Sequence, residues 1–113
     1  MGRSNPHVFN FYLSFLENKV YDSVGFFGQD GENDFSRAIP SKNKYFYDLS
    51  LKNWNINVFP YPKSRKFDLI VCTKCAYFSK SPDKTVSEFS DMLNPGGKIL
   101  IDWGLGDHWR FKN

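Results

Sequence analysis

Cys72 and Cys75 are the two cysteines of the chain, and their C-x-x-C spacing suits two kinds of chemistry. A redox dithiol needs one thiol at the start of a helix, where the thiol pKa is lowered. A zinc site needs two further ligands, and the two histidines, His7 and His108, lie near opposite ends of the sequence. Cys72 also ends an apolar run, in which a small cysteine packs like a hydrophobic side chain. We therefore expect packing cysteines, with a thiol oxidoreductase as an alternative, and no bound metal.

Helices and strands must position these residues, and the sequence predicts that the two alternate. Apolar runs of strand length are typical of strands covered on both faces, as in parallel sheets. Four strands are expected, at residues 21–28, 44–47, 67–72 and 98–103. Proline at helix starts and apolar spacing predict helices at residues 6–19, 35–39 and 82–93, the last with Val86, Phe89 and Leu93 on its inner face. The Asn- and Pro-rich residues 49–66 are expected to be irregular.

This order of elements predicts an α/β fold. We expect a minimal Rossmann-like three-layer arrangement with a mostly parallel sheet of about four to five strands. Residues 1–113 are expected to form a single domain, because a chain of this length has room for one core only. The aromatic content of 19% predicts a core built on few but large side chains.

Composition and charge narrow the class of protein further. With 41% hydrophobic and 24% charged residues, the chain is not expected to be disordered. The net charge of +3 comes from cations and anions spread along the sequence, so nucleic acid is not an expected partner. No apolar run approaches the roughly 20 residues of a membrane span, and the N-terminal residues carry no secretory signal. We expect a cytoplasmic protein.

The second half of the chain carries four motifs in a fixed order. They are Phe59-Pro60-Tyr61-Pro62, the strand FDLIVC at 67–72, a helix from Pro82, and LNPGGKILI at 93–101. In this order and spacing they resemble the class I S-adenosylmethionine-dependent methyltransferases, over residues 44–103. The resemblance implies S-adenosylmethionine as the cofactor and methyl transfer to an unidentified small-molecule acceptor. The alternative is a catalytically inactive member of this fold that serves as a binding or assembly module.

The resemblance also implies a cofactor site at the carboxyl ends of the early strands, where open α/β sheets bind ligands. The family's first strand ends in a loop of the form D/E-x-G-x-G-x-G. The matching place here is residues 25–31, GFFGQDG, with glycines spaced by three. A strand-end turn with glycines at positive φ is the alternative. The implied cofactor-binding residues are Gly25, Phe26, Gly28, Asp48, Leu49 and Cys72.

Asp48 has two interpretations within the resemblance. It is either the acid near the adenine amino group, or residues 44–48 are the second strand and Asp48 accepts hydrogen bonds from the ribose hydroxyls. A turn-capping aspartate is the alternative that involves no ligand. Asp68, at the start of a strand, is interpreted in the same structural way, as a cap or turn carboxylate.

The last ten residues follow the strand that matches 99–102, where family members continue with further strands. Trp103, Trp109 and Phe111 are more aromatic surface than a solvated tail exposes. We expect them to dock on the chain's own core or on a second copy, which makes a homodimer a hypothesis. His108 and Asp107 are not expected to be catalytic, and no catalytic base is assigned.

Overall fold

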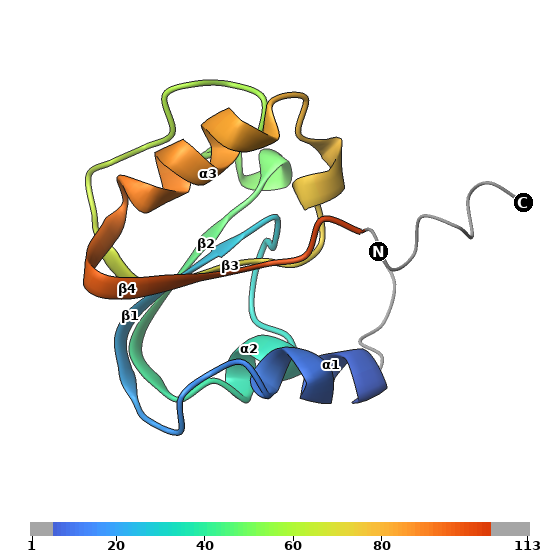
Figure 1. Ribbon diagram of the computed structural model, residues 1–113, viewed down its shortest axis with the longest axis vertical. Coiled ribbons are helices and arrows are strands. Elements are labelled where there is room, and N and C mark those ends of the chain that lie inside the picture. Colours follow the sequence, from blue (N-terminus) through green and yellow to red (C-terminus); the bar gives the residue numbers. More distant parts are fainter. Residues whose placement is uncertain (1–5, 105–113) are drawn as a thin grey trace, which may run out of the picture.

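The computed structural model describes residues 6–104 and shows three layers (Figure 1). A four-stranded sheet has α3 on one face and α1 and α2 on the other. The elements are α1 (Pro6–Leu13), β1 (Tyr21–Phe27), α2 (Asp34–Arg37), β2 (Ser41–Tyr47), β3 (Phe67–Cys72), α3 (Pro82–Ser90) and β4 (Leu93–Ile101). The predicted α/β, Rossmann-like three-layer fold is confirmed.

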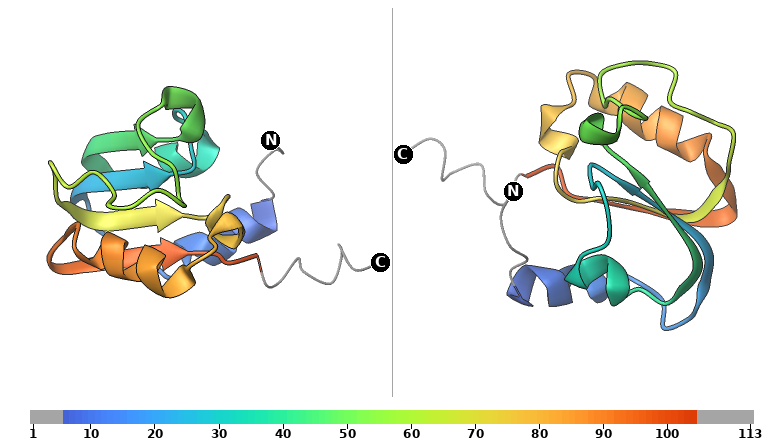
Figure 2. Two further views of the ribbon diagram at one scale, coloured as in Figure 1. Left: turned by 90° about the horizontal axis from the view of Figure 1, so that it is seen from above. Right: turned by 180° about the vertical axis from the view of Figure 1, so that it is seen from behind.

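The sheet is parallel throughout, with the strand order β2-β1-β3-β4. Gly25 in β1 is paired with Tyr45 of β2 on one side and with Ile70 of β3 on the other, and Ile70 is paired with Ile99 of β4. All four arrows therefore point to the same edge of the sheet (Figure 2). Whatever follows the strands at that edge is brought together.

Two cores fill the spaces between the layers, because successive residues of a strand face opposite sides. In β1, Phe26 packs toward α1 and α2 with Leu69, whereas Phe27 packs toward α3 with Phe67 and Phe89. Aromatic side chains dominate the α3 side, as the composition predicted. Phe27, for example, stacks on Tyr47 with ring centroids 4.5 Å apart.

The connection between β2 and β3 is irregular, as predicted, with one 3₁₀ turn at Leu49–Leu51. Asn53 in this connection covers the end of the outer edge of β2. Its Nδ2 donates to the Phe46 carbonyl at 2.9 Å, and its Oδ1 accepts from the Asp48 N–H at 2.9 Å. A single side-chain amide thus makes the two hydrogen bonds that one residue of a further parallel strand would make.

Several element boundaries differ from the sequence prediction. α1 ends at Leu13 rather than near residue 19, and residues 14–16 form turns. β4 begins at Leu93 rather than at Lys98, because Leu93 already pairs with Phe67 before an irregularity in the ladder. Val86 is 38% exposed, so its predicted place on the inner face of α3 is wrong, and the neighbouring Thr85 is buried instead.

Thr85 is fully buried although its side chain is polar, because its hydroxyl has hydrogen-bond partners in the core. Its Oγ1 is hydrogen-bonded to the hydroxyl of Tyr61 at 3.0 Å and to that of Ser79 at 2.8 Å. Tyr61 also donates to the Ile56 carbonyl at 2.7 Å, and burial raises the pKa of Tyr61 to about 12.

Among residues 6–104, no helix has the length and the apolar character that crossing a membrane requires.

Candidate functional site at the carboxyl edge of the sheet

The carboxyl ends of the strands bring together three of the six residues that the sequence placed in a cofactor site, Gly28, Asp48 and Leu49. Gly28 follows β1 and donates its N–H to the Tyr47 carbonyl at 2.7 Å, which holds it beside the end of β2. Asp102 follows β4 and donates its N–H to the Cys72 carbonyl at 3.0 Å, at the end of β3. This is the edge at which open α/β sheets bind ligands.

Of the three glycines in the expected loop, Gly28 is the one that directly follows β1 at this edge. Its φ is +88°, a conformation that favours glycine. A Cβ built on Gly28 would lie 2.4 Å from the Cys75 Sγ. The missing side chain therefore makes room for the Cys75 thiol. Gly31 differs, because nothing lies within 4 Å of the position of its Cβ.

Asp48 caps the turn that follows β2. Its Oδ2 accepts hydrogen bonds from the Ser50 N–H at 3.0 Å and from the Ser50 hydroxyl at 2.5 Å. No donor among the described residues bonds its Oδ1. The predicted capping role is therefore present and leaves one carboxylate oxygen for another partner. β2 pairs directly with β1 and is therefore the second strand of the fold, and Asp48 is the residue that follows it, as the ribose interpretation of Asp48 requires.

The other three expected cofactor-binding residues belong to strands and not to the segments that follow them. Gly25 is inside β1, and a Cβ there would lie 2.9 Å from the Phe27 ring. Phe26 is fully buried on the opposite face. Cys72 is the last residue of β3 and is also fully buried. The expected loop thus starts at Gly28 and not at Gly25.

Cys72 and Cys75 lie in contact at the end of β3, with their sulfurs 3.8 Å apart. Cys72 belongs to the α3-side core, as the packing interpretation predicted, and Cys75 is half-buried against it. The hydrogen bond from Cys72 lowers the pKa of the Cys75 thiol, against the opposing effects of burial and of the Asp48 charge. The hydrogen bond to Cys75 and burial raise the pKa of Cys72. Within the described residues, no group of three or more His, Cys, Asp or Glu is placed to hold a metal.

Asp68 in β3 and Asp102 after β4 have both carboxylate oxygens bonded by the protein. Asp68 accepts from the Ser23 N–H at 3.2 Å and from the Asn94 amide at 3.1 Å, which ties β1, β3 and the start of β4 together at the amino edge. Its role is structural, as predicted, but its carboxylate joins neighbouring strands instead of capping a turn. Asp102 accepts from the Tyr12 hydroxyl and from the Gly104 N–H.

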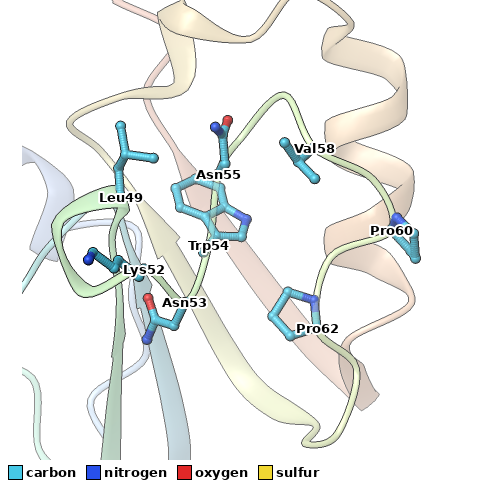
Figure 3. Close-up of a pocket in the computed structure, with 8 residues that line it drawn as sticks. All are labelled: Leu49, Lys52, Asn53, Trp54, Asn55, Val58, Pro60 and Pro62. Atoms are coloured by element: carbon cyan, nitrogen blue, oxygen red, sulfur yellow. The ribbon is translucent and has the colours of Figure 1, made fainter.

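A groove of about 430 Å³ begins where β2 ends (Figure 3). Its lining residues all come from the connection between β2 and β3: Leu49, Lys52, Asn53, Trp54, Asn55, Val58, Pro60 and Pro62. Leu49, the residue after Asp48, is 67% exposed. Trp54 is buried, and none of the described residues offers an acceptor to its indole Nε1.

Sequence reasoning selected Leu49 but missed the rest of the groove. The available signal was a tryptophan and two prolines in a polar connection directly after a strand that carries a ligand candidate. Trp103, which was expected to dock on the core or on a second copy, is partly buried against the α3-side core. The expectations for Asp107, His108, Trp109 and Phe111 lie outside the described residues.

A family model described as a methyltransferase domain matches residues 33–101, more than half of the chain. The chain belongs to the class I S-adenosylmethionine-dependent methyltransferase family. The match spans β2, β3, α3 and β4, and it begins after the glycines at positions 25, 28 and 31. Searches of curated proteins and of solved structures found no match.

The residues at the carboxyl edge of this methyltransferase domain suit one half of the family's cofactor and not the other. The nucleoside half fits, because Asp48 Oδ1 has no described donor and the groove begins at the adjacent Leu49. The methionine half does not fit at Gly28, because the Cys75 sulfur fills the space over that glycine. The N–H groups of Gly28 and Gln29 both bond the Tyr47 carbonyl, so neither points to a ligand.

Proposed function

We propose that this methyltransferase domain binds S-adenosylmethionine at the carboxyl edge of the sheet, with the nucleoside at Asp48 and in the adjoining groove. The observation that carries the proposal is the Asp48 carboxylate, which ends the second strand with one oxygen engaged by Ser50 and the other without a described donor. A carboxylate in this state accepts hydrogen bonds from vicinal hydroxyls.

The residues after Asp48 supply the apolar part of the site. Leu49 is exposed at the mouth of the groove, and the Trp54 ring and two prolines form its walls. Most of the surface of a ligand pocket is apolar, with a few polar groups that fix orientation. Asp48 is such a group at one end. The purine of the nucleoside would lie against Leu49 and the indole.

When bound, S-adenosylmethionine supplies an activated methyl group. The methyl acceptor that we propose is a small molecule, as the family resemblance implies. The described residues supply binding and orientation. Of the two aspartates that follow strands at this edge, Asp102 has both oxygens engaged and only Asp48 has one left over. No proton acceptor for the acceptor molecule is therefore assigned.

A second function, ligand binding or assembly without transfer, is favoured by one observation. The Cys75 thiol fills the space over Gly28, where the family pattern sets a glycine loop around the methionine part. A domain that retains the nucleoside site and lacks the methionine site would bind the cofactor or its nucleoside and leave the methyl group in place.

Calorimetric titration with S-adenosylhomocysteine tests the proposal. We expect saturable binding to the wild type and about tenfold or greater weakening in Asp48→Asn, because hydrogen bonds to a charged acceptor contribute about 1.5–3 kcal/mol. Asp22→Asn is the matched control, since Asp22 is an exposed carboxylate near the start of β1. Its affinity should equal that of the wild type. Absence of heat at about 1 mM ligand, a concentration that reveals even a −4 kcal/mol interaction, would remove the proposal.

Transfer and binding alone are separated by a second measurement. The wild type is incubated with S-adenosylmethionine and a small-metabolite extract, and S-adenosylhomocysteine is quantified by mass spectrometry. Formation above the Asp48→Asn level supports methyl transfer. Binding in the calorimeter with no product above that level supports the module without transfer.

A further inference from the structure

The two cysteines form a pair whose members differ in access. Cys72 is fully buried in the core between the sheet and α3. Cys75 is half-buried and lies three residues later, at the carboxyl edge of the sheet. A reagent from solvent can therefore reach Cys75 and cannot reach Cys72 without local opening.

The sulfurs are close enough to be joined by a small movement. They are 3.8 Å apart, and a disulfide bond is about 2.05 Å long, so one sulfur must approach the other by about 1.8 Å. The Cys75 Sγ has no bonded partner that holds it rigidly. Among residues 6–104 its hydrogen-bond partners are Cys72 and the Phe27 carbonyl, and the latter accepts from it at 4.0 Å. Both cysteines are free thiols in the structure.

The hydrogen bond between the thiols also makes their pKa values differ. This hydrogen bond lowers the pKa of Cys75 and raises that of Cys72. The thiolate is the nucleophile in thiol–disulfide exchange, so the accessible member of the pair is also the more readily ionised one. The buried member is placed to act second.

We propose that Cys72 and Cys75 form a thiol–disulfide exchange site, with a low-molecular-weight disulfide as the oxidant, Cys75 as the attacking thiol and Cys72 as the resolving thiol. In the first step the Cys75 thiolate forms a bond to one sulfur of the oxidant, and the other sulfur leaves as a thiolate that takes up a proton. In the second step Cys72 loses its proton and attacks the Cys75 sulfur. The Cys72–Cys75 bond forms, and the second thiol of the oxidant is released. Two protein thiols are oxidised and one small disulfide is reduced to two thiols.

The proposal does not depend on cofactor binding. The same Cys75 sulfur lies over Gly28, so its oxidation state changes a contact at the carboxyl edge. The exchange itself needs only the two cysteines and the oxidant. Failure of the nucleoside site and failure of the exchange site are therefore separate results.

Intact-mass spectrometry after incubation with oxidised glutathione tests the exchange site. We expect the wild type to lose two hydrogens, to resist alkylation at both cysteines and to regain both thiols with dithiothreitol. Cys72→Ala, which removes the resolving thiol, should accumulate one glutathione adduct that peptide mapping places on Cys75. Cys75→Ala should remain unmodified under the same conditions, because the thiol that it retains, that of Cys72, is buried.

Circular dichroism before the incubation restricts the comparison to folded variants, and Cys72→Ser replaces Cys72→Ala if the latter is unfolded. Two results overturn the proposal. In the first, the wild type keeps two alkylatable thiols after the incubation and the Cys72 variant carries no adduct. In the second, Cys72 in the folded Cys75→Ala variant forms an adduct as fast as Cys75 does in the Cys72 variant.

Discussion

The sulfur of Cys75 lies 2.4 Å from the position that a Cβ on Gly28 would take. This relationship sets how closely the segments after β1 and β3 approach each other at the carboxyl edge. It also ties together two patterns that look independent in the sequence, the spaced glycines and the C-x-x-C pair. A glycine is required at position 28 because the Cys75 sulfur occupies the space that a side chain would need.

Gly28→Ala should therefore destabilise the fold. A φ of +88° is unfavourable for alanine, and the new Cβ would meet the Cys75 sulfur, so we expect a loss of about 1–3 kcal/mol in urea unfolding. Gly31→Ala is the matched control, because the added Cβ meets open space, and its stability should lie within about 0.5 kcal/mol of the wild type. Equal losses in the two variants would contradict the placement of Cys75.

Asn53→Ala should weaken the end of β2. The variant loses both hydrogen bonds that cover the outer edge, to the Phe46 carbonyl and from the Asp48 N–H. We expect a loss of about 1–2 kcal/mol by chemical denaturation, from two bonds of ordinary net strength. Asn43→Ala removes one long bond, 3.3 Å to the Asp22 carbonyl, and should cost less than about 0.5 kcal/mol. A loss in Asn53→Ala no larger than in Asn43→Ala would show that the edge is not held by this side chain.

Glu88 should give the fold an acid-sensitive contribution. Its carboxylate accepts from the Lys63 ammonium and, at 2.8 Å, from the Tyr61 N–H, and these bonds lower the pKa of Glu88 below its ordinary value near 4.5. A lowered folded-state pKa stabilises the fold above the unfolded pKa, and this stabilisation is lost as the pH falls through the folded value. The wild-type urea midpoint should therefore drop between pH about 5 and about 3 by more than that of Glu88→Gln. Parallel pH curves for the two proteins would refute the contribution.

The fold could be predicted from the sequence where one type of physical signal dominated. Residues 67–72 are apolar except for Asp68, and a strand covered on both faces buries such a run. Pro82 starts α3 because proline fits the first helical position. The apolar spacing of α3 wrongly predicted that Val86 is buried. This spacing does not reveal that Thr85 has hydroxyl partners in the core. Packing partners distant in sequence decided the burial.

The candidate site was predictable in part. Asp48 and Leu49 were selected because they follow a strand, and the parallel sheet places them at the edge where such residues meet. Gly25 was assigned to the cofactor loop by the resemblance to the family's glycine pattern, but it lies inside β1, where the rings of Phe27 and Phe67 leave no room for a side chain. The groove at Trp54 depends on the path of the irregular connection between β2 and β3. Hydrophobic periodicity in the sequence does not predict the path of an irregular segment.

The most direct test of the nucleoside site is to map amide and indole chemical shifts by NMR during a titration with S-adenosylhomocysteine. We predict that the shifted signals include the Asp48 and Leu49 amides and the Trp54 indole N–H, identified by its loss in Trp54→Phe. The signals of Ser23 and Asn94, which bond Asp68 at the amino edge, should stay in place. Shifts confined to the amino edge, or none at a saturating ligand concentration, would contradict the account.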